Sequence, residues 1–415
     1  MLQEYGRTVR TASESVPYRH GRPARRTVGL FLPGRSFSLD GAYVSAKSSA
    51  DADHLALYHP ACPPLAPLLL CRTMSSMRDE TLACGACAAA FMAHGMAEAL
   101  AAGQSLRERQ VRHLEVLGRG SSGHAGTALR YAFAQSGLSV SAAMPSIAAT
   151  RDSLPPMPAT ALMAISQSGR SPDLVRYAQL ARQAGAFVVG LINSDGSPLG
   201  AAVERQVPLQ AGPEVAVAAT KSVVMSVIAG LAMVAAYRAD PRLLAALRGL
   251  PRRLDEAAGC DWSALTALLP QARAVFVVGR GADLGIAKEL ALKITEAVGT
   301  PALAFSSAEF LHGPLGAVSA QTPVLGLISD PNAVDSVLTA LERARSQGAR
   351  TLLAHGCDAH PEVPSAQLRL PAATGTLADC VLALVPAYLA IEAAAVLAGR
   401  NPDRPSGLSK VTETR

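Results

Sequence analysis

The sequence contains the same strand–turn–helix pattern twice. Gly118–Gly120 follows the strand-like stretch His113–Leu117, and Gly279–Gly281, with the same Gly-Arg-Gly letters, follows Ala274–Val278. Further strand-like stretches alternate with helical segments after both turns, a pattern typical of parallel sheets with helices on both faces. The sequence therefore predicts an α/β fold built from two copies of one doubly wound unit.

Composition changes along the chain separate a first segment from the body. Residues 1–76 carry Arg, Ser, Pro and Gly without a sustained hydrophobic period, so we expect them to be disordered or to lie upstream of a true start at Met74 or Met77. An arginine-rich transit peptide is the alternative. The other predicted boundaries are a helical segment at 77–110, a first unit at 111–240, a linker at 241–261, a second unit at 262–398 and a tail at 399–415.

Charge and hydropathy indicate whether nucleic acids or membranes should be expected as binding partners. The net charge is +6, but residues 1–76 hold nine Lys and Arg against five Asp and Glu, and the rest holds 29 against 27. The nearly neutral body has no basic patch interleaved with aromatic residues, so we expect no nucleic-acid partner. No apolar run approaches the roughly 20 residues of a membrane span, and no secretory signal is recognisable. We expect a cytoplasmic protein without a membrane partner.

The cysteines do not indicate a disulfide framework, because seven of them are scattered over 415 residues. Cys84 and Cys87 have the spacing of a redox pair, but they precede an alanine-rich helix. No second pair is near enough to complete a zinc site with His94. We therefore expect neither a redox centre nor a metal site.

A loop rich in hydroxyl groups joins a buried strand to a helix in the first unit. Apolar residues Ala161–Ile165 precede it, Leu174–Arg182 follow it at helical spacing, and Pro172 suits the first helical position. Free N–H groups and the positive end of the helix dipole meet there, so an anion should bind. An ordinary serine-capped turn is the alternative. The polar side chains of this loop are Ser166, Gln167, Ser168 and Ser171.

The first Gly-Arg-Gly turn also matches the dinucleotide-binding fingerprint, Gly-x-Gly-x-x-Gly, at residues 118–123. That fingerprint requires an acidic residue about 20 positions later to hold a ribose. Residues 138–144 contain none, and the first acid is Asp152. A glycine loop with Ser121 and Ser122 but no acid favours a small phosphate over a nicotinamide cofactor.

Candidate acid–base residues lie in the second unit. Glu289, Lys293 and Glu296 are spaced to share one helix face. A solvated face with a Glu–Lys pair is the alternative. His312 precedes Gly-Pro in the loop 305–314, just past a carboxylate and two hydroxyls, where an imidazole suits acid–base work. A hydrogen-bonded structural histidine is the alternative.

Five motifs in order, within a region from Met77 to Arg415, resemble the double sugar isomerase (SIS) domain family that handles amino-sugar phosphates. The motifs are Gly118 to Ser122, Ser166 to Gly169, Ala216 to Lys221, Phe305 to Pro314 and Lys410 to Thr412. The resemblance implies two tandem SIS domains, each a flavodoxin-like, doubly wound parallel sheet flanked by helices.

Two branches of this family differ at the N-terminus. The synthase branch, glutamine–fructose-6-phosphate aminotransferase, carries a glutaminase domain with a cysteine directly after the initiator Met. Here position 2 is Leu, and fewer than 80 residues precede the isomerase region, so we expect no glutamine-dependent route. The Ser-Gly-Arg-Ser-Pro-Asp ending of the hydroxyl-rich loop resembles type II glucosamine-6-phosphate deaminase instead.

The resemblance also assigns roles to residues. Glu296 would carry the proton between C1 and C2 of the sugar, assisted by Glu289 and Lys293. His312 would open the sugar ring, and Lys410 on the tail would close over the sugar. In relatives the equivalent histidine comes from the partner subunit, which implies a homodimer with a shared active site. The resemblance assigns phosphate binding to Ser121, Ser122, Ser166, Gln167, Ser168 and Ser171, and contacts with the sugar to Val217 and Ala219.

The reaction that this resemblance implies is deamination of glucosamine 6-phosphate by water to fructose 6-phosphate and ammonia, with no metal or cofactor. Relatives often have His-Ala-Glu where this chain has Pro301–Leu303, which removes one carboxylate. The alternatives are therefore a galactosamine-6-phosphate deaminase, a deglycase acting on a fructosyl-amine phosphate, or a non-catalytic phosphosugar sensor.

Overall fold

The computed structural model describes residues 75–356 and 365–410, together with four short strands earlier in the chain. The chain divides into two units, Met1–Met74 and Ser75–Arg415. In the first unit two antiparallel pairs form, which are β1 (Gly29–Leu32) with β2 (Arg35–Ser38) and β3 (Tyr43–Ser45) with β4 (Ala56–Tyr58). The other residues of 1–74 and residues 411–415 lie outside the described residues, so the predictions about disorder and about the end of the tail stay predictions.

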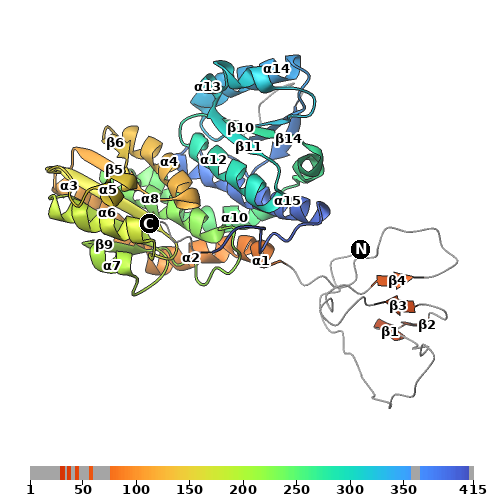
Figure 1. The fold of residues 1–415 in the computed structure, drawn as a ribbon, viewed down its shortest axis with the longest axis horizontal. Coiled ribbons are helices and arrows are strands. Elements are labelled where there is room, and N and C mark those ends of the chain that lie inside the picture. Colours follow the sequence, from red (N-terminus) through yellow and green to blue (C-terminus); the bar gives the residue numbers. More distant parts are fainter. Residues whose placement is uncertain are drawn as a thin grey trace, which may run out of the picture. The chain divides into compact units, whose positions relative to one another are not determined.

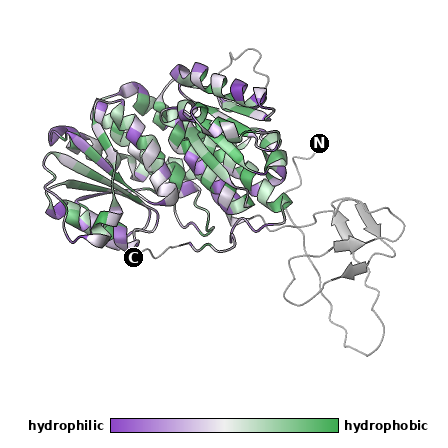
Figure 2. Cartoon of the chain, turned by 45° about the horizontal axis from the view of Figure 1, so that its top comes forward, coloured by the Kyte–Doolittle hydropathy of each residue, from purple (hydrophilic) through white to green (hydrophobic). Residues whose placement is uncertain are grey.

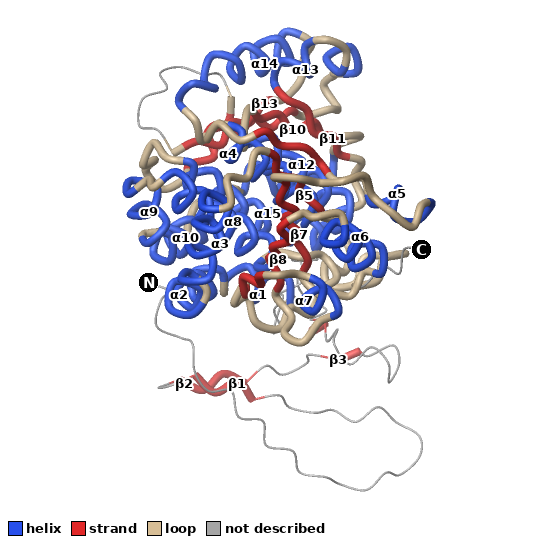
Figure 3. The backbone as a smooth tube through the Cα atoms, turned by 90° about the vertical axis from the view of Figure 1, so that its left-hand side faces the viewer, coloured by secondary structure: helices blue, strands red, loops and turns tan. Residues whose placement is uncertain are grey.

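The first α/β half of the second unit is a five-stranded parallel sheet with the order β6-β5-β7-β8-β9. Its strands are β5 (His113–Leu117), β6 (Ser139–Ala142), β7 (Thr160–Ser166), β8 (Phe187–Ile192) and β9 (Arg205–Pro208). Its helices are α4 (Gly120–Ala134), α5 (Pro145–Thr150), α6 (Pro172–Gln183) and α7 (Pro198–Ala202). The central strands are apolar without alternation because helices flank the sheet (Figure 3).

The second half repeats this topology, with the parallel order β11-β10-β12-β13-β14. Its strands are β10 (Val275–Gly279), β11 (Ala302–Ser306), β12 (Val324–Ile328), β13 (Thr351–His355) and β14 (Ala366–Arg369). Its helices include α12 (Asp283–Lys293), α13 (Ser307–Leu311) and α14 (Val334–Ser346). In both sheets the first strand lies between the second and the third. The predicted α/β fold with two doubly wound sheets is confirmed.

Besides four short segments, η1 (Leu269–Gln271), η2 (Ile294–Val298), η3 (Pro314–Ala317) and η4 (Pro331–Ala333), the second unit contains nine further helical segments (Figure 1). They are α1 (Ser76–Leu82), α2 (Cys84–His94), α3 (Met96–Glu108), α8 (Lys221–Arg238), α9 (Pro241–Arg248), α10 (Leu250–Ala258), α11 (Ser263–Leu268), the 3-10 segment η5 (Leu377–Ala383) and α15 (Leu384–Leu397). One hydrophobic core contains buried residues from both halves, including Leu114, Met233, Val277 and Tyr388. Figure 2 shows this apolar interior in green.

The predicted linker at 241–261 contains two short helices, α9 and α10. Pro241 and Pro251 lie in the first turns of these helices, where a missing N–H costs no hydrogen bond. Asp240 caps α9 by accepting from the N–H groups of Arg242 and Leu243, each at 3.0 Å. The prolines therefore mark helix starts.

Two helices of the described residues are long and apolar enough to cross a membrane, contrary to the prediction from run length. They are Lys221–Arg238 and the continuous stretch Leu377–Leu397, with mean hydropathies of 1.4 and 2.2. The fold buries 83% and 78% of these two windows. A helix surrounded by protein is apolar on all faces, so burial in the core accounts for their composition.

Candidate active site

The two serine-containing loops of the first half meet at one edge of its sheet. β5 and β7 are neighbours, with Leu117 beside Ala164, so both following segments begin at the same carboxyl edge. The strand order reverses between these two strands, which is where open α/β sheets bind ligands. Arg119 links the loops, because its Nε and Nη2 donate to Oδ2 of Asp173 at 2.9 and 2.5 Å.

Four polar side chains at this edge are available to a ligand. Ser121, Ser122, Gln167 and Ser171 are half-buried, and their side chains form no hydrogen bond with any described residue. They lie at or beside the first turns of α4 and α6, whose N–H groups and dipoles favour an anion. The arrangement suits a phosphate group.

Ser166 and Ser168 are already engaged within their loop. Ser166 is buried, and its Oγ accepts from the N–H of Gly169 at 2.9 Å. Ser168 Oγ accepts from the N–H of Arg170 at 3.3 Å. Gly169 has φ +63°, and a Cβ there would lie 2.2 Å from Ser197 Oγ, so only glycine fits. These hydroxyls therefore hold the loop and retain their protons for a ligand.

Close packing of α4 against α12 joins the two halves beside this edge. A Cβ on Gly285 would lie 2.3 Å from the amide nitrogen of Ala128 and 2.7 Å from the carbonyl oxygen of His124. Nearer the other end of the contact, a Cβ on Gly120 would lie 4.0 Å from Leu292. The two helices therefore run antiparallel, and the start of α4 lies beside the end of α12.

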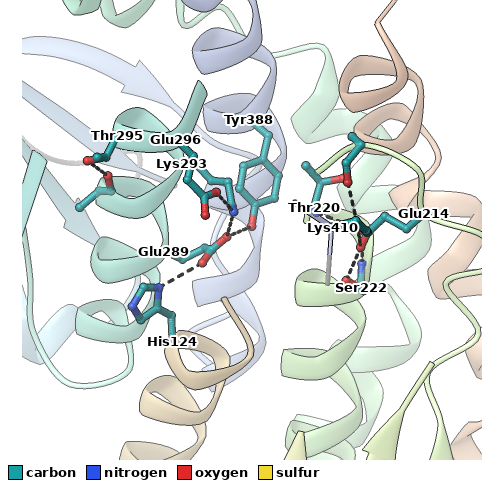
Figure 4. A network of polar contacts seen from close by, with 12 residues as sticks. His124, Glu214, Thr220, Ser222, Glu289, Lys293, Thr295, Glu296, Tyr388 and Lys410 are labelled. Carbon is teal, nitrogen blue, oxygen red and sulfur yellow. Dashed lines mark hydrogen bonds and ion pairs between the residues drawn. The ribbon is translucent and has the colours of Figure 1, made fainter. Parts of the chain in front are cut away.

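A buried polar network lies at that end of α12 (Figure 4). Glu289 and Lys293 are each 1% exposed, and Lys293 Nζ is 3.6 Å from Glu289 Oε1. Tyr388 from α15 donates to the same oxygen at 3.1 Å, and His124 Nδ1 from α4 lies 3.2 Å from Glu289 Oε2. Lys293 also donates to Glu296 Oε2. The predicted shared face is present, but it faces the protein interior, so the alternative of a solvated face is wrong.

The electrostatics of this network follow from its burial. Burial alone would lower the pKa of Lys293, but Glu289 and Glu296 outweigh it and hold that pKa above its usual value. Burial, followed by the nearby Glu289 carboxylate, raises the pKa of Tyr388 well above its usual range. Lys293 is therefore an ammonium group between two carboxyl groups, and Tyr388 is a neutral donor.

Glu296 reaches Lys293 because α12 ends in a π turn, η2 (Ile294–Val298), closed by Gly299 at φ +74°. A π turn widens the helix locally and is frequent at functional sites. The Glu296 side chain is 20% exposed, against 1% for Lys293. Of the three, Glu296 is the group that a substrate can approach.

Lys410 lies in a second polar cluster, formed by the tail and the start of α8 (Figure 4). Its Nζ donates to Glu214 Oε2 at 3.0 Å and to the carbonyl oxygen of Ala216 at 2.6 Å. Burial would raise the pKa of Glu214, but Lys410 and hydrogen bonds from Ser222 and Thr220 hold it below its usual value. The tail lysine is therefore held by a fully buried carboxylate.

The two residues assigned to the sugar lie in this segment. Val217 and Ala219 are half-buried, and the N–H of Val217 donates to the carbonyl oxygen of Asp403 at 3.0 Å. The Asp403 carboxylate in turn accepts from the N–H groups of Ser76 and Met77 at 2.9 and 2.8 Å, which caps α1. The tail is thus fastened to the Val217 backbone before it reaches Lys410.

His312 is exposed and stands apart from these clusters. It is the C-cap of α13, and its side chain forms no hydrogen bond or ion pair with the described residues. The predicted loop 305–314 is partly helical, because it contains α13, which Ser306 caps. The Ser307 and Ser336 hydroxyls share a hydrogen bond of 2.6 Å. Among the described residues, no hydrogen bond or ion pair joins His312 to Glu296.

Sequence reasoning missed five participants, which are His124, Tyr388, Glu214 and the paired residues Arg119 and Asp173. His124 directly follows the first glycine loop, and Asp173 follows Pro172, so their positions offered a signal. Tyr388 lies 99 residues from Glu289, and no local pattern links them. Among residues 75–356 and 365–410, no group of three or more His, Cys, Asp or Glu is placed to hold a metal ion.

Comparisons with known proteins agree with this architecture. The SIS domain model matches residues 109–236 and 268–397. A glutamine–fructose-6-phosphate aminotransferase (isomerizing) from Pyrobaculum aerophilum is 30% identical over 315 residues, which cover 72% of this chain and 51% of that protein. The chain thus spans about half the length of the curated relatives it matches.

Solved structures extend the likeness. A "putative phosphosugar isomerase" from Silicibacter pomeroyi DSS-3 has 32% identity and a TM-score of 0.75, covering 80% of this chain and all of the other. Glucosamine-6-phosphate deaminase from Thermotoga maritima has 17% identity and a TM-score of 0.64, covering 82% of this chain and all of the other. The second likeness is one of fold.

Proposed function

The chain belongs to the SIS domain family, and from this premise we propose that it converts glucosamine 6-phosphate and water to fructose 6-phosphate and ammonia. The family and the homology to the isomerase half of glutamine–fructose-6-phosphate aminotransferase imply a sugar phosphate as ligand. The main support for this reaction is the buried Glu289–Lys293–Glu296 network, which lies beside the free hydroxyls of the first half.

In this scheme the first half holds the phosphate. The free side chains of Ser121, Ser122, Gln167 and Ser171 and the helix N-termini would donate to its oxygens, joined by the protons of the Ser166 and Ser168 hydroxyls. Lys410 would close the site from the tail, and the segment of Val217 and Ala219 would contact the sugar.

The second half performs the proton transfer. Glu296 removes the proton from C2 of the open-chain amino aldose while the aldehyde oxygen gains a proton, which forms an enamine. Glu296 returns the proton to C1, and the resulting C2 imine adds water and expels ammonia. Lys293 orients the Glu296 carboxylate, and Glu289 holds Lys293. General acid–base groups of this kind contribute about 10²–10⁴-fold each.

We further propose that His312 opens the sugar ring across a homodimer interface, because its side chain is exposed and unpaired within its own protomer's described residues. The scheme uses no metal or cofactor, and a cytoplasmic location suits a sugar-phosphate substrate.

The test is incubation with glucosamine 6-phosphate in the absence of glutamine, followed by assay of ammonia and fructose 6-phosphate. We expect equal amounts of the two products, and none from unphosphorylated glucosamine. Parallel assays with galactosamine 6-phosphate and a fructosyl-amine phosphate test the substrate, because Leu303 stands where relatives often carry a carboxylate. Binding of the sugar phosphates without turnover would replace the proposal with a sensor.

A further inference from the structure

The contact between His124 and Glu289 is the direct polar link between the phosphate-binding half and the acid–base half. His124 belongs to α4, on the same helix face as Ser121 one turn earlier, and Glu289 belongs to α12. Their 3.2 Å contact sits where Gly285 lets the two helices approach closely (Figure 4).

Glu289 has two oxygens and three partners. Oε2 faces His124 Nδ1, and Oε1 receives the Tyr388 hydroxyl at 3.1 Å and faces Lys293 at 3.6 Å. An ionised carboxylate only accepts hydrogen bonds, so in this contact Nδ1 of His124 carries the proton. His124 is thus the single protein donor to Oε2 among the described residues.

The partners of Glu289 determine which of the two carboxylates Lys293 binds more closely. Lys293 lies closer to Glu296 than to Glu289, although both carboxylates compete for it. Because His124 and Tyr388 satisfy Glu289, the ammonium is left to orient Glu296. Without the His124 donor, Oε2 of Glu289 would be buried and unpaired, and Lys293 would be drawn back toward it.

We propose that His124 is a positioning residue, whose ring N–H holds Glu289 so that Lys293 presents Glu296 to the substrate bound at the serine loops. This role rests on the proposed function. His124 acts through Glu289 and Lys293, and its effect belongs to the proton-transfer step rather than to substrate binding.

The test compares two substitutions. His124→Asn retains an N–H donor at the δ position, whereas His124→Leu keeps an apolar side chain of similar reach without a donor. We expect His124→Leu to lower kcat about tenfold or more with KM within about twofold, as loss of a hydrogen bond to a charged group predicts. His124→Asn should stay within about threefold of the parent kcat. Equal effects of the two variants, or a change confined to KM, would overturn the proposal.

Two further measurements separate positioning from general damage. In a Glu289→Gln background, His124→Leu should reduce kcat no further, because the first substitution has already altered the contact between residues 124 and 289. Additive losses would contradict the proposal. His94→Leu, on the exposed end of α2, is the matched control and should leave kcat unchanged.

A readout without turnover keeps the link testable if the reaction is different. In the parent, nitrogen NMR of the labelled imidazole should show the proton on Nδ1 of His124, and Glu289→Gln should shift this signal. If the parent releases no ammonia, the proposed function fails, yet the NMR result still decides whether His124 holds Glu289. An unchanged signal in Glu289→Gln would refute that contact.

Discussion

The two halves share one strand order, but the loops at equivalent sheet edges carry opposite chemistry. After β5, the first half presents the half-buried hydroxyls of Ser121 and Ser122. In the second Gly-Arg-Gly turn, Ala282 and Asp283 stand in their places. Both carboxylate oxygens of Asp283 are occupied, accepting from Ser329 N–H at 2.8 Å and from Ser329 Oγ at 2.6 Å. The second Gly-Arg-Gly turn therefore carries a carboxylate where the first carries two hydroxyls without a partner among the described residues.

This difference is the reason why the proposed scheme assigns phosphate binding to one half and proton transfer to the other. The second Gly-Arg-Gly turn offers a carboxylate instead of hydroxyls, so we assign no phosphate to it, and the acid–base candidates of the second half lie further along α12. The packing of α12 on α4 places those groups beside the proposed anion site of the first half. In the proposed scheme, the active site therefore belongs to the contact between the two copies rather than to either copy alone.

The sharpest test of the acid–base half is Glu296→Gln, which preserves shape while removing the proposed base. We expect kcat to fall at least about 10²-fold with KM little changed, since the lost group acts only in proton transfer. Steady-state ammonia release measures both constants. Near-parent turnover would place the base elsewhere, with Glu309 as the next candidate.

The corresponding test of the anion half is the double variant Ser166→Ala/Ser168→Ala. Loss of even one hydrogen bond to a charged group should cost about 1.5–3 kcal/mol, so KM for the phosphosugar should rise at least about tenfold. Ser329→Ala, in the loop after β12, is the matched control and should leave KM unchanged. A KM that moves only in the control would reverse the assignment of the two halves.

Ionisation of Asp283 should make the free energy of unfolding depend on pH. Burial raises the pKa of this carboxyl from 3.8 to about 6. Because the folded-state pKa is raised, ionisation of Asp283 opposes folding above pH 6, and the penalty disappears as pH falls below the unfolded value. Asp283→Asn should therefore stabilise the protein at pH 8 by on the order of 3 kcal/mol, and progressively less toward pH 4.

Urea unfolding across this pH range measures the effect, with the exposed Asp335→Asn as control. A gain for Asp283→Asn that is independent of pH would mean that Asp283 does not titrate in this range.

Gly285→Ala tests the contact between the halves with a smaller expected effect. A Cβ would overlap backbone atoms of α4, so the helices must separate slightly, at a cost of about 1–3 kcal/mol in unfolding free energy. Gly316→Ala, where a Cβ meets no atom within 4 Å, is the control. If both variants unfold alike, the close approach of α4 and α12 is not a constraint.

Local patterns in the sequence predicted most of the α/β framework, but not the polar contacts that surround Glu289 and Glu296. β5 matches the expected strand at both ends, and β7 and β10 differ from theirs by one residue at each end, because short strands between turn residues leave a local signal in the sequence. The helices within the predicted linker were not foreseen, since a proline's position within a first turn is not visible in composition. The π turn at Glu296 and the contacts of Glu289 with His124 and Tyr388 depend on packing between distant segments, which no local period encodes.

The central claim is that one half binds the substrate and the other moves its proton, and calorimetric titration with fructose 6-phosphate tests it most directly. Titration of Glu296→Gln should give a Kd within about twofold of the parent, whereas Ser166→Ala/Ser168→Ala should bind at least about tenfold more weakly. Equal weakening in both variants, or weaker binding by Glu296→Gln alone, would contradict the division of labour between the halves.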